Sequence, residues 1–130
     1  MKIMMEMGHG DEITITDGNF PSLSYSNRII RCDGLTIDEL LDAIIYYFPL
    51  DYLDREPVKM MSCPKDVLDG QIVREKYEKI LVPYFLENQT IDFLDRQDFY
   101  DRANKSIVTV VTSDQARFAN IILRKGVVKD

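Results

Sequence analysis

The single histidine of the chain stands between two glycines in the segment Gly8-His9-Gly10. An imidazole titrates at about pH 6.5 and can both donate and accept a proton at neutral pH, so His9 is a candidate general acid–base group. Asp11 could orient His9 or simply end a loop, and Asp17 stands before Gly18, where an aspartate also suits a turn. From the pattern alone, a histidine that merely bridges backbone groups remains the more common case.

Two polar residues in the second half of the chain are further candidates for a binding site. Arg96 falls at a predicted strand-to-helix junction, a common place for binding residues in α/β proteins, although such a charge can also be merely solvated. Asn120 lies within an apolar run, and a buried asparagine needs partners, either backbone groups or a bound ligand. Tyr100 falls on the apolar stripe of a predicted helix and is expected in the core.

The sequence contains none of the common motifs for a catalytic serine, a bound nucleotide or a paired-cysteine metal site. One histidine and the two distant cysteines Cys32 and Cys63 make a poor metal site, and the cysteines are expected as reduced thiols. The residues therefore predict a site of sparse polar groups that uses no cofactor and no metal.

Alternating strands and helices predict an α/β fold. Ile13 and Ile15 alternate with threonines, which is typical of a half-buried strand, and Thr36 with Glu39 has the form of a helix capping box. Strands are predicted over 13–16, 28–32, 58–63, 90–94 and 107–112, and helices over 37–48, 70–87 and 96–106. Residues 119–124 could form a strand or a helix, and a closing strand is favoured. We expect a single domain over 1–130, with a largely parallel central sheet of about six strands and helices on both faces.

Composition and charge exclude several classes of partner. The 130 residues carry a net charge of -6, which argues against nucleic acid or anionic lipid as partners. No apolar run approaches the roughly 20 residues of a membrane-spanning helix. The N-terminus carries Glu6 and lacks a long apolar segment, so it does not read as a signal peptide, and a cytoplasmic protein is expected.

Several of these segments together resemble the ribose pyranase and fucose mutarotase family. The resemblance begins at residues 7–13, continues through Asp17 with the Asn-Phe-Pro of residues 19–21, and ends at residues 120–127; between them lie the segments 30–34 and 99–103. It therefore covers nearly the whole chain. Arg96 and the Phe-Tyr-Asp-Arg-Ala segment at 99–103 are similar to the L-fucose branch, whereas the ribose branch usually has histidine where Arg96 stands.

The resemblance implies an isomerase that interconverts the α and β anomers of a free monosaccharide, most simply L-fucose, and possible interconversion of its pyranose and furanose rings, without a cofactor. By this resemblance His9 is the proton donor, because ring opening needs a proton at the ring oxygen and the removal of another from the anomeric hydroxyl. The residues that it assigns to sugar binding are Asp17, Arg96, Phe118, Ala119 and Asn120.

Two departures from the family pattern bear on this expectation. Relatives usually have tyrosine where this chain has Phe118, so we expect weaker binding or a shifted sugar preference but not a lost reaction. Relatives also carry an additional helix before the Gly-His-Gly motif, whereas here six residues precede Met7. Relatives form rings, typically decamers, with the sugar site near a subunit contact. The resemblance thus implies a homo-oligomer, while the missing helix leaves the decamer open.

Two alternatives to an L-fucose mutarotase remain from the sequence. One is a D-ribose pyranase of the same family. The other is a non-catalytic monosaccharide-binding or assembly protein, which would bind sugar without accelerating the exchange of its anomers.

Overall fold

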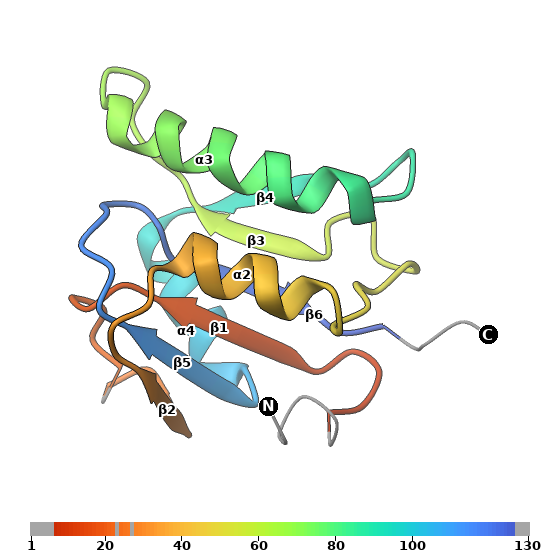
Figure 1. The fold of residues 1–130 in the computed structure, drawn as a ribbon, viewed down its shortest axis with the longest axis horizontal. Helices are drawn as coiled ribbons and strands as arrows, with labels where there is room; N and C mark the ends of the chain where they lie inside the picture. The colour runs from red at the N-terminus through yellow and green to blue at the C-terminus, as the bar shows by residue number, and fades with distance from the viewer. Residues whose placement is uncertain (1–6, 23, 27, 127–130) are drawn as a thin grey trace.

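A six-stranded sheet forms the centre of the protein (Figure 1). The structure, a computed structural model, describes residues 7–22, 24–26 and 28–126, so the question of an additional N-terminal helix lies outside the described residues. The strand order is β2-β5-β1-β6-β3-β4. The strands are β1 (Glu12–Thr16), β2 (Ile29–Cys32), β3 (Val58–Met61), β4 (Ile91–Leu94), β5 (Val108–Thr112) and β6 (Ile121–Arg124).

The sheet is largely parallel, as predicted from the sequence. β1 and β2 both pair in parallel with β5, and β3 pairs in parallel with β4. β6 lies between β1 and β3 and is antiparallel to both. Five strands therefore share one direction, and the favoured assignment of residues 119–124 to a closing strand is confirmed over Ile121–Arg124.

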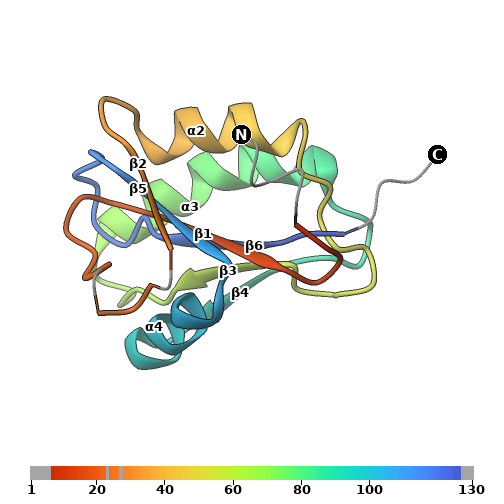
Figure 2. The ribbon, with the colours of Figure 1, turned by 90° about the horizontal axis from the view of Figure 1, so that it is seen from below.

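Helices cover both faces of the sheet (Figure 2). α2 (Ile37–Ile45) and α3 (Leu68–Leu81) lie on one face, and α4 (Arg96–Lys105) lies on the other. The predicted capping box is present at the start of α2, where the Thr36 side chain accepts from the Glu39 amide and Glu39 accepts from the Thr36 amide. α3 ends before Pro83, which lies in the short 3-10 helix η1 (Val82–Tyr84), since proline offers no amide for a continuing α-helix.

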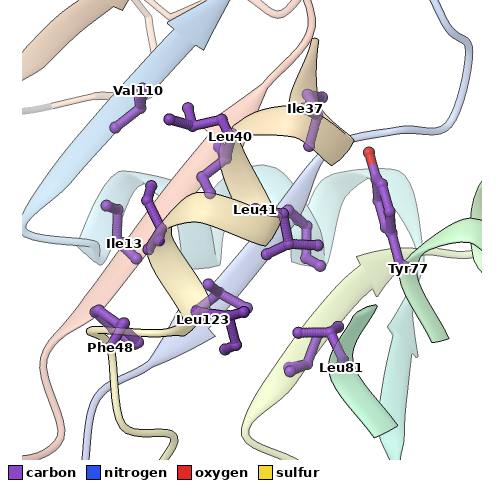
Figure 3. Packing of buried hydrophobic residues seen from close by; sticks show 14 of the residues in the cluster. Ile13, Ile37, Leu40, Leu41, Phe48, Tyr77, Leu81, Val110 and Leu123 are labelled. Atoms are coloured by element: carbon purple, nitrogen blue, oxygen red, sulfur yellow. The ribbon is translucent and has the colours of Figure 1, made fainter. Parts of the chain in front are cut away.

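The main hydrophobic core lies between the sheet and the pair α2 and α3 (Figure 3). Figure 3 shows Leu41 and Leu81 from the two helices close to Leu123 of β6, with the ring of Tyr77 beside them. A smaller cluster on the other face packs Phe99 and Ala103 of α4 against the sheet. Because apolar burial is the main driving force for folding, these two layers fix the position of all three helices.

The prediction of a half-buried strand at 13–16 is wrong in one respect. Every residue of β1 is buried, the threonines included. The reason is that α4 and the residue after it cover the threonine face: the Thr14 hydroxyl donates to Ser106 Oγ at 2.9 Å. Alternation of Ile and Thr therefore marks two buried faces here, one apolar and one hydrogen-bonded.

The common direction of five strands separates the candidate residues into two groups. Asp17 follows β1, Arg96 follows β4, and residues 113–120 join β5 to β6, so these lie at the edge where the parallel strands end. His9 precedes β1 and lies at the opposite edge. In open α/β sheets the first of these edges is the usual place for a ligand.

Candidate functional site

A pocket of about 200 Å³ opens at the edge where the parallel strands end. It is smaller than the roughly 300–1,000 Å³ typical of pockets for drug-sized ligands, so its size suits a smaller molecule. Its polar lining residues are Asp17, Asn19, Arg96, Arg117 and Asn120. Its apolar lining residues are Phe20, Met61, Tyr100, Ala116 and Phe118.

Asp17 and Asn120 form the buried floor of this pocket. The Asp17 amide donates to Asn120 Oδ1 at 2.8 Å, and the Asn19 amide donates to Asp17 Oδ1 at 2.9 Å. The first bond uses the amide oxygen of Asn120, so its NH₂ group is the part that can donate to a ligand. Burial raises the pKa of the Asp17 carboxyl above its usual value, against the lowering effect of the backbone amides of Asn19 and Phe20.

Arg96 supplies positive charge at the rim, and the start of α4 sets its place. The Asp95 side chain caps that helix by accepting from the Asp98 amide at 2.8 Å. Arg96 is therefore the first helical residue after a strand end, as the sequence predicted. Its exposed guanidinium can donate several hydrogen bonds to oxygen atoms in the pocket.

Phe118 lines the pocket from an unusual backbone conformation. Its φ is 59°, in the left-handed region that few aromatic residues adopt. Its ring packs beside the Arg117 guanidinium, 5.5 Å from ring centre to Cζ. Ala119, which follows, is fully buried and does not line the pocket with its side chain; its carbonyl accepts a hydrogen bond from the Tyr77 hydroxyl at 2.7 Å.

Tyr100 lines the pocket too, although the sequence pattern favoured a core position for it. Its ring packs edge-on against Phe20, with ring centres 5.3 Å apart, and also contacts Tyr25. Tyr100 is only partly buried against the smaller core cluster, so the expected core position is met in part. The pattern could not indicate that α4 begins beside a pocket whose other walls come from three distant segments.

His9 lies in a second group of polar residues, at the opposite edge of the sheet. His9 Nε2 is 3.1 Å from Asp51 Oδ1, and Asp51 Oδ2 forms an ion pair with Arg124 Nε at 3.2 Å. The Asp51 side chain is only 3% exposed, whereas that of His9 is 37% exposed. Asp51 therefore holds one imidazole nitrogen and leaves Nδ1 for a partner outside this group.

The conformation of the loop around His9 requires glycine at position 10 but not at position 8. Gly10 has a φ of 88°, and a Cβ atom there would lie 3.3 Å from Arg124 Nη2. Asp11 does not orient His9; its Oδ2 accepts from the Gly8 amide at 2.7 Å and so fixes the turn. The residue that holds His9 is Asp51, which the sequence analysis missed because nothing local marks the aspartate after Pro49-Leu50.

The structure thus brings together Asp17, Arg96, Phe118 and Asn120, and keeps His9 apart from them within one chain. The five residues of β1 alone span about 13 Å at a rise of about 3.3 Å per residue. The residues around His9 and those lining the pocket have no member in common. The pocket supplies a carboxylate, guanidinium groups and an amide, whereas the imidazole belongs to the other group.

The described part of the chain holds neither a cluster of metal-binding side chains nor a helix that could span a membrane. Among residues 7–22, 24–26 and 28–126, no three His, Cys, Asp or Glu side chains gather in a way that could hold a metal ion. None of the helices in these ranges has the length and apolar character needed to cross a bilayer.

Comparison with known proteins gives a consistent picture. Residues 1–128 match the family described as the RbsD / FucU transport protein family. The fucose mutarotase of Streptococcus pneumoniae, solved in complex with L-fucose, is 42% identical, with a TM-score of 0.90 over 98% of this chain and 91% of that chain. FucU from Bifidobacterium longum is 32% identical, with a TM-score of 0.82 over 98% of this chain and 93% of that chain.

A more distant structure shares the fold. Bacillus subtilis RbsD, solved in complex with D-ribose, is 19% identical, with a TM-score of 0.77 over 98% of this chain and 91% of that chain. The match to the family extends over almost the whole sequence, and the structures compared share the fold of this chain. The chain belongs to the RbsD / FucU family.

Proposed function

We propose that the protein is a sugar mutarotase that interconverts the α and β anomers of L-fucose without a cofactor. The observation that carries the proposal is the pocket in which Asp17, Arg96 and Asn120 meet from three distant segments of the chain. A carboxylate, a guanidinium and an amide are the groups that recognise a set of sugar hydroxyls. The S. pneumoniae fucose mutarotase, described with L-fucose, supports the same reading by similarity.

The reaction needs one proton delivered to the ring oxygen and one removed from the anomeric hydroxyl. When the ring has opened, rotation about the bond between carbons 1 and 2 followed by reclosure exchanges the two anomers. In this proposal His9 is the proton donor, and Asp51 holds its imidazole in one orientation through the bond at 3.1 Å. Asp17, Arg96 and Asn120 hold the hydroxyls, and the backbone at Phe118 and Ala119 borders the sugar.

A complete site in this proposal requires a second copy of the chain. His9 and the pocket lie at opposite edges of the same sheet, so His9 of one chain cannot serve its own pocket without a large change of fold. A neighbouring copy that sets its His9 edge against the pocket would join the two incomplete groups. The protein is therefore proposed to act as a homo-oligomer, and a ring such as a decamer is one closed arrangement that repeats this contact.

The apolar wall of the pocket favours L-fucose over D-ribose. L-Fucose is a 6-deoxy sugar with a methyl group, and D-ribose has none. Phe20, Met61 and Phe118 provide an apolar surface beside the polar floor, where such a methyl group would be removed from water. D-ribose pyranase activity remains the alternative within the family, since Bacillus subtilis RbsD was solved with D-ribose.

Saturation-transfer NMR on equilibrated sugars tests the proposal. Added protein should speed the exchange between the α and β resonances of L-fucose much more than the exchange among the ring forms of D-ribose. The opposite preference would support the pyranase instead. Acceleration of neither sugar, at concentrations where both bind, would support a non-catalytic binding protein.

The variant His9→Ala tests the assigned proton donor. We expect it to bind L-fucose while losing about 100-fold or more of the accelerated exchange, the usual contribution of a general acid. Asp33→Asn, a change at an exposed carboxylate that lines neither the pocket nor the His9 group, serves as the matched control and should keep the wild-type rate. If His9→Ala accelerates exchange as well as the wild type does, the mechanism proposed here is wrong.

A further inference from the structure

A buried tyrosine on α3 is tied to the loop that forms one wall of the pocket. The Tyr77 hydroxyl donates to the carbonyl of Ala119 at 2.7 Å. Tyr77 is 2% exposed and Ala119 is fully buried, so water does not compete for this bond. Tyr77 contributes nothing to the lining of the pocket itself.

The loop concerned, residues 113–120, begins with a turn at Asp114 and carries four of the residues that line the pocket: Ala116, Arg117, Phe118 and Asn120. Asp114 fixes that first turn: its Oδ1 accepts from the Ala116 amide and its Oδ2 from the Ile37 amide at the start of α2, both at 2.9 Å. At its far end, Asn120 Oδ1 accepts from the Asp17 amide. The bond from Tyr77 reaches the loop between these two anchors, at Ala119.

The middle of the loop has a conformation that needs such support. Phe118 has a φ of 59°, which an L-residue with a large side chain rarely adopts unless the surrounding structure holds it. The Arg117 side chain, which packs beside the Phe118 ring, is 68% exposed, and its ion pair with Asp69 is long, at 3.7 Å. The Ala119 carbonyl belongs to the peptide that joins Ala119 to Asn120. Holding it therefore restrains the backbone that carries the Asn120 side chain and, through Ala119, the backbone of Phe118.

We propose that Tyr77 is a positioning residue of the sugar site, whose hydroxyl holds the Ala119 carbonyl and thereby sets the Phe118 ring and the Asn120 amide in the pocket. The expected effect on sugar binding rests on the proposed function. The expected effect on the loop does not depend on it. Burial raises the pKa of the Tyr77 phenol, so the hydroxyl stays protonated and remains a donor across the working pH range.

The ring and the hydroxyl of Tyr77 have separable roles. The ring packs in the main core between α3, α2 and the sheet, a role that phenylalanine would fill equally well (Figure 3). In Figure 3 the ring lies beside Leu41 while its oxygen points away from Leu81. Tyr77→Phe therefore removes the hydroxyl and leaves the packing, which makes it a direct test.

The kinetic test compares Tyr77→Phe with a matched loss of another buried hydroxyl. Ser106 is 2% exposed and donates to the Ala103 carbonyl at 2.6 Å beyond the end of α4, and it does not line the pocket. We expect Tyr77→Phe to raise KM for L-fucose in anomer exchange by about three- to tenfold, the range for one lost hydrogen bond. Ser106→Ala should leave KM within about twofold of the wild type, whatever its unfolding temperature.

A second readout does not depend on the enzyme being active. Amide hydrogen exchange followed by mass spectrometry should show faster exchange in the peptide covering residues 113–122 for Tyr77→Phe, and wild-type exchange there for Ser106→Ala. If the wild type does not accelerate the exchange of any sugar, the proposed function fails while this measurement still decides the role of Tyr77. Unchanged KM in Tyr77→Phe, an equal rise in both variants, or unchanged amide exchange at 113–122 would each overturn the inference.

Discussion

Asp17, a lining residue of the pocket, illustrates how a buried carboxyl can cost stability. It follows a fully buried strand and is 8% exposed, and within the described part of the chain the hydrogen bonds to its carboxylate come from the backbone amides of Asn19 and Phe20. A carboxyl in such a place would normally be replaced by a neutral group unless a ligand needs its charge. Phe118 costs stability through its backbone, because an aromatic residue is strained at positive φ. It also lines the same pocket.

The variant Asp17→Asn should stabilise the protein at neutral pH while weakening sugar binding. Burial raises the pKa of Asp17, so between the ordinary aspartate pKa and the raised value the folded state binds more protons than the unfolded chain. The free energy of unfolding of the wild type therefore falls, through this group, as pH rises across that window. Asparagine keeps an oxygen acceptor for the Asn19 amide and has no such loss.

Urea unfolding at a series of pH values measures this effect. The advantage of Asp17→Asn should be largest at pH 7 and should shrink as pH falls towards about 3.9, the ordinary aspartate value. A wild type that is more stable than Asp17→Asn at pH 7 would contradict the assignment.

At the scale of secondary structure, the ion pair between β1 and α4 fixes the helix that begins with Arg96. Arg102 Nε and Nη2 donate to the two carboxylate oxygens of Glu12 at 2.7 and 2.8 Å. The Glu12 side chain is 10% exposed and that of Arg102 is 35% exposed, so the carboxylate depends on its partner more than the guanidinium does. This paired geometry is the strong form of a carboxylate–arginine contact.

The variant Arg102→Met should lower the free energy of unfolding by about 2–3 kcal/mol, less than a fully buried pair because the guanidinium is partly solvated. Thermal and chemical unfolding measure this loss. The double variant with Glu12→Gln should recover much of it, since no buried charge is then left unpaired. Arg31→Met, which breaks an exposed pair with Asp33, is the control and should cost less than about 1 kcal/mol. Equal losses in Arg102→Met and Arg31→Met would contradict this account of the pair.

Periodicity and capping predicted the elements well because their causes are local. The Thr36 capping box, the β-branched run of β5 and the helix over 96–105 are each specified by residues a few positions apart. Asp17, Arg96 and Asn120 could be singled out because each interrupts or ends an apolar segment. Asp51 and Tyr77 could not, since their partners His9 and Ala119 are each 42 residues away and meet them only through the sheet and core.

At the scale of the whole protein, the decisive feature is that the candidate residues lie at two opposite edges of the sheet. The pocket lies where five strands end, and His9 with Asp51 lies where they begin. Exposed aromatic and aliphatic side chains also lie near the end of α2 and in η1. They include Tyr46, Tyr47 and Tyr84. Exposed apolar surface of this kind is common at protein contacts, which agrees with the proposed assembly of copies.

A mixture of two inactive variants tests the central claim that one copy completes the site of another. His9→Ala keeps an intact pocket, and Arg96→Ala keeps an intact His9 edge. Each variant alone should have lost most of the accelerated anomer exchange of L-fucose in saturation-transfer NMR. When the two are co-expressed, random assembly gives about a quarter of the sites an intact His9 and an intact Arg96 from different chains, so the rate should recover towards about a quarter of the wild-type value. A mixed preparation that forms oligomers by light scattering but is no faster than the sum of the two variants would contradict the account.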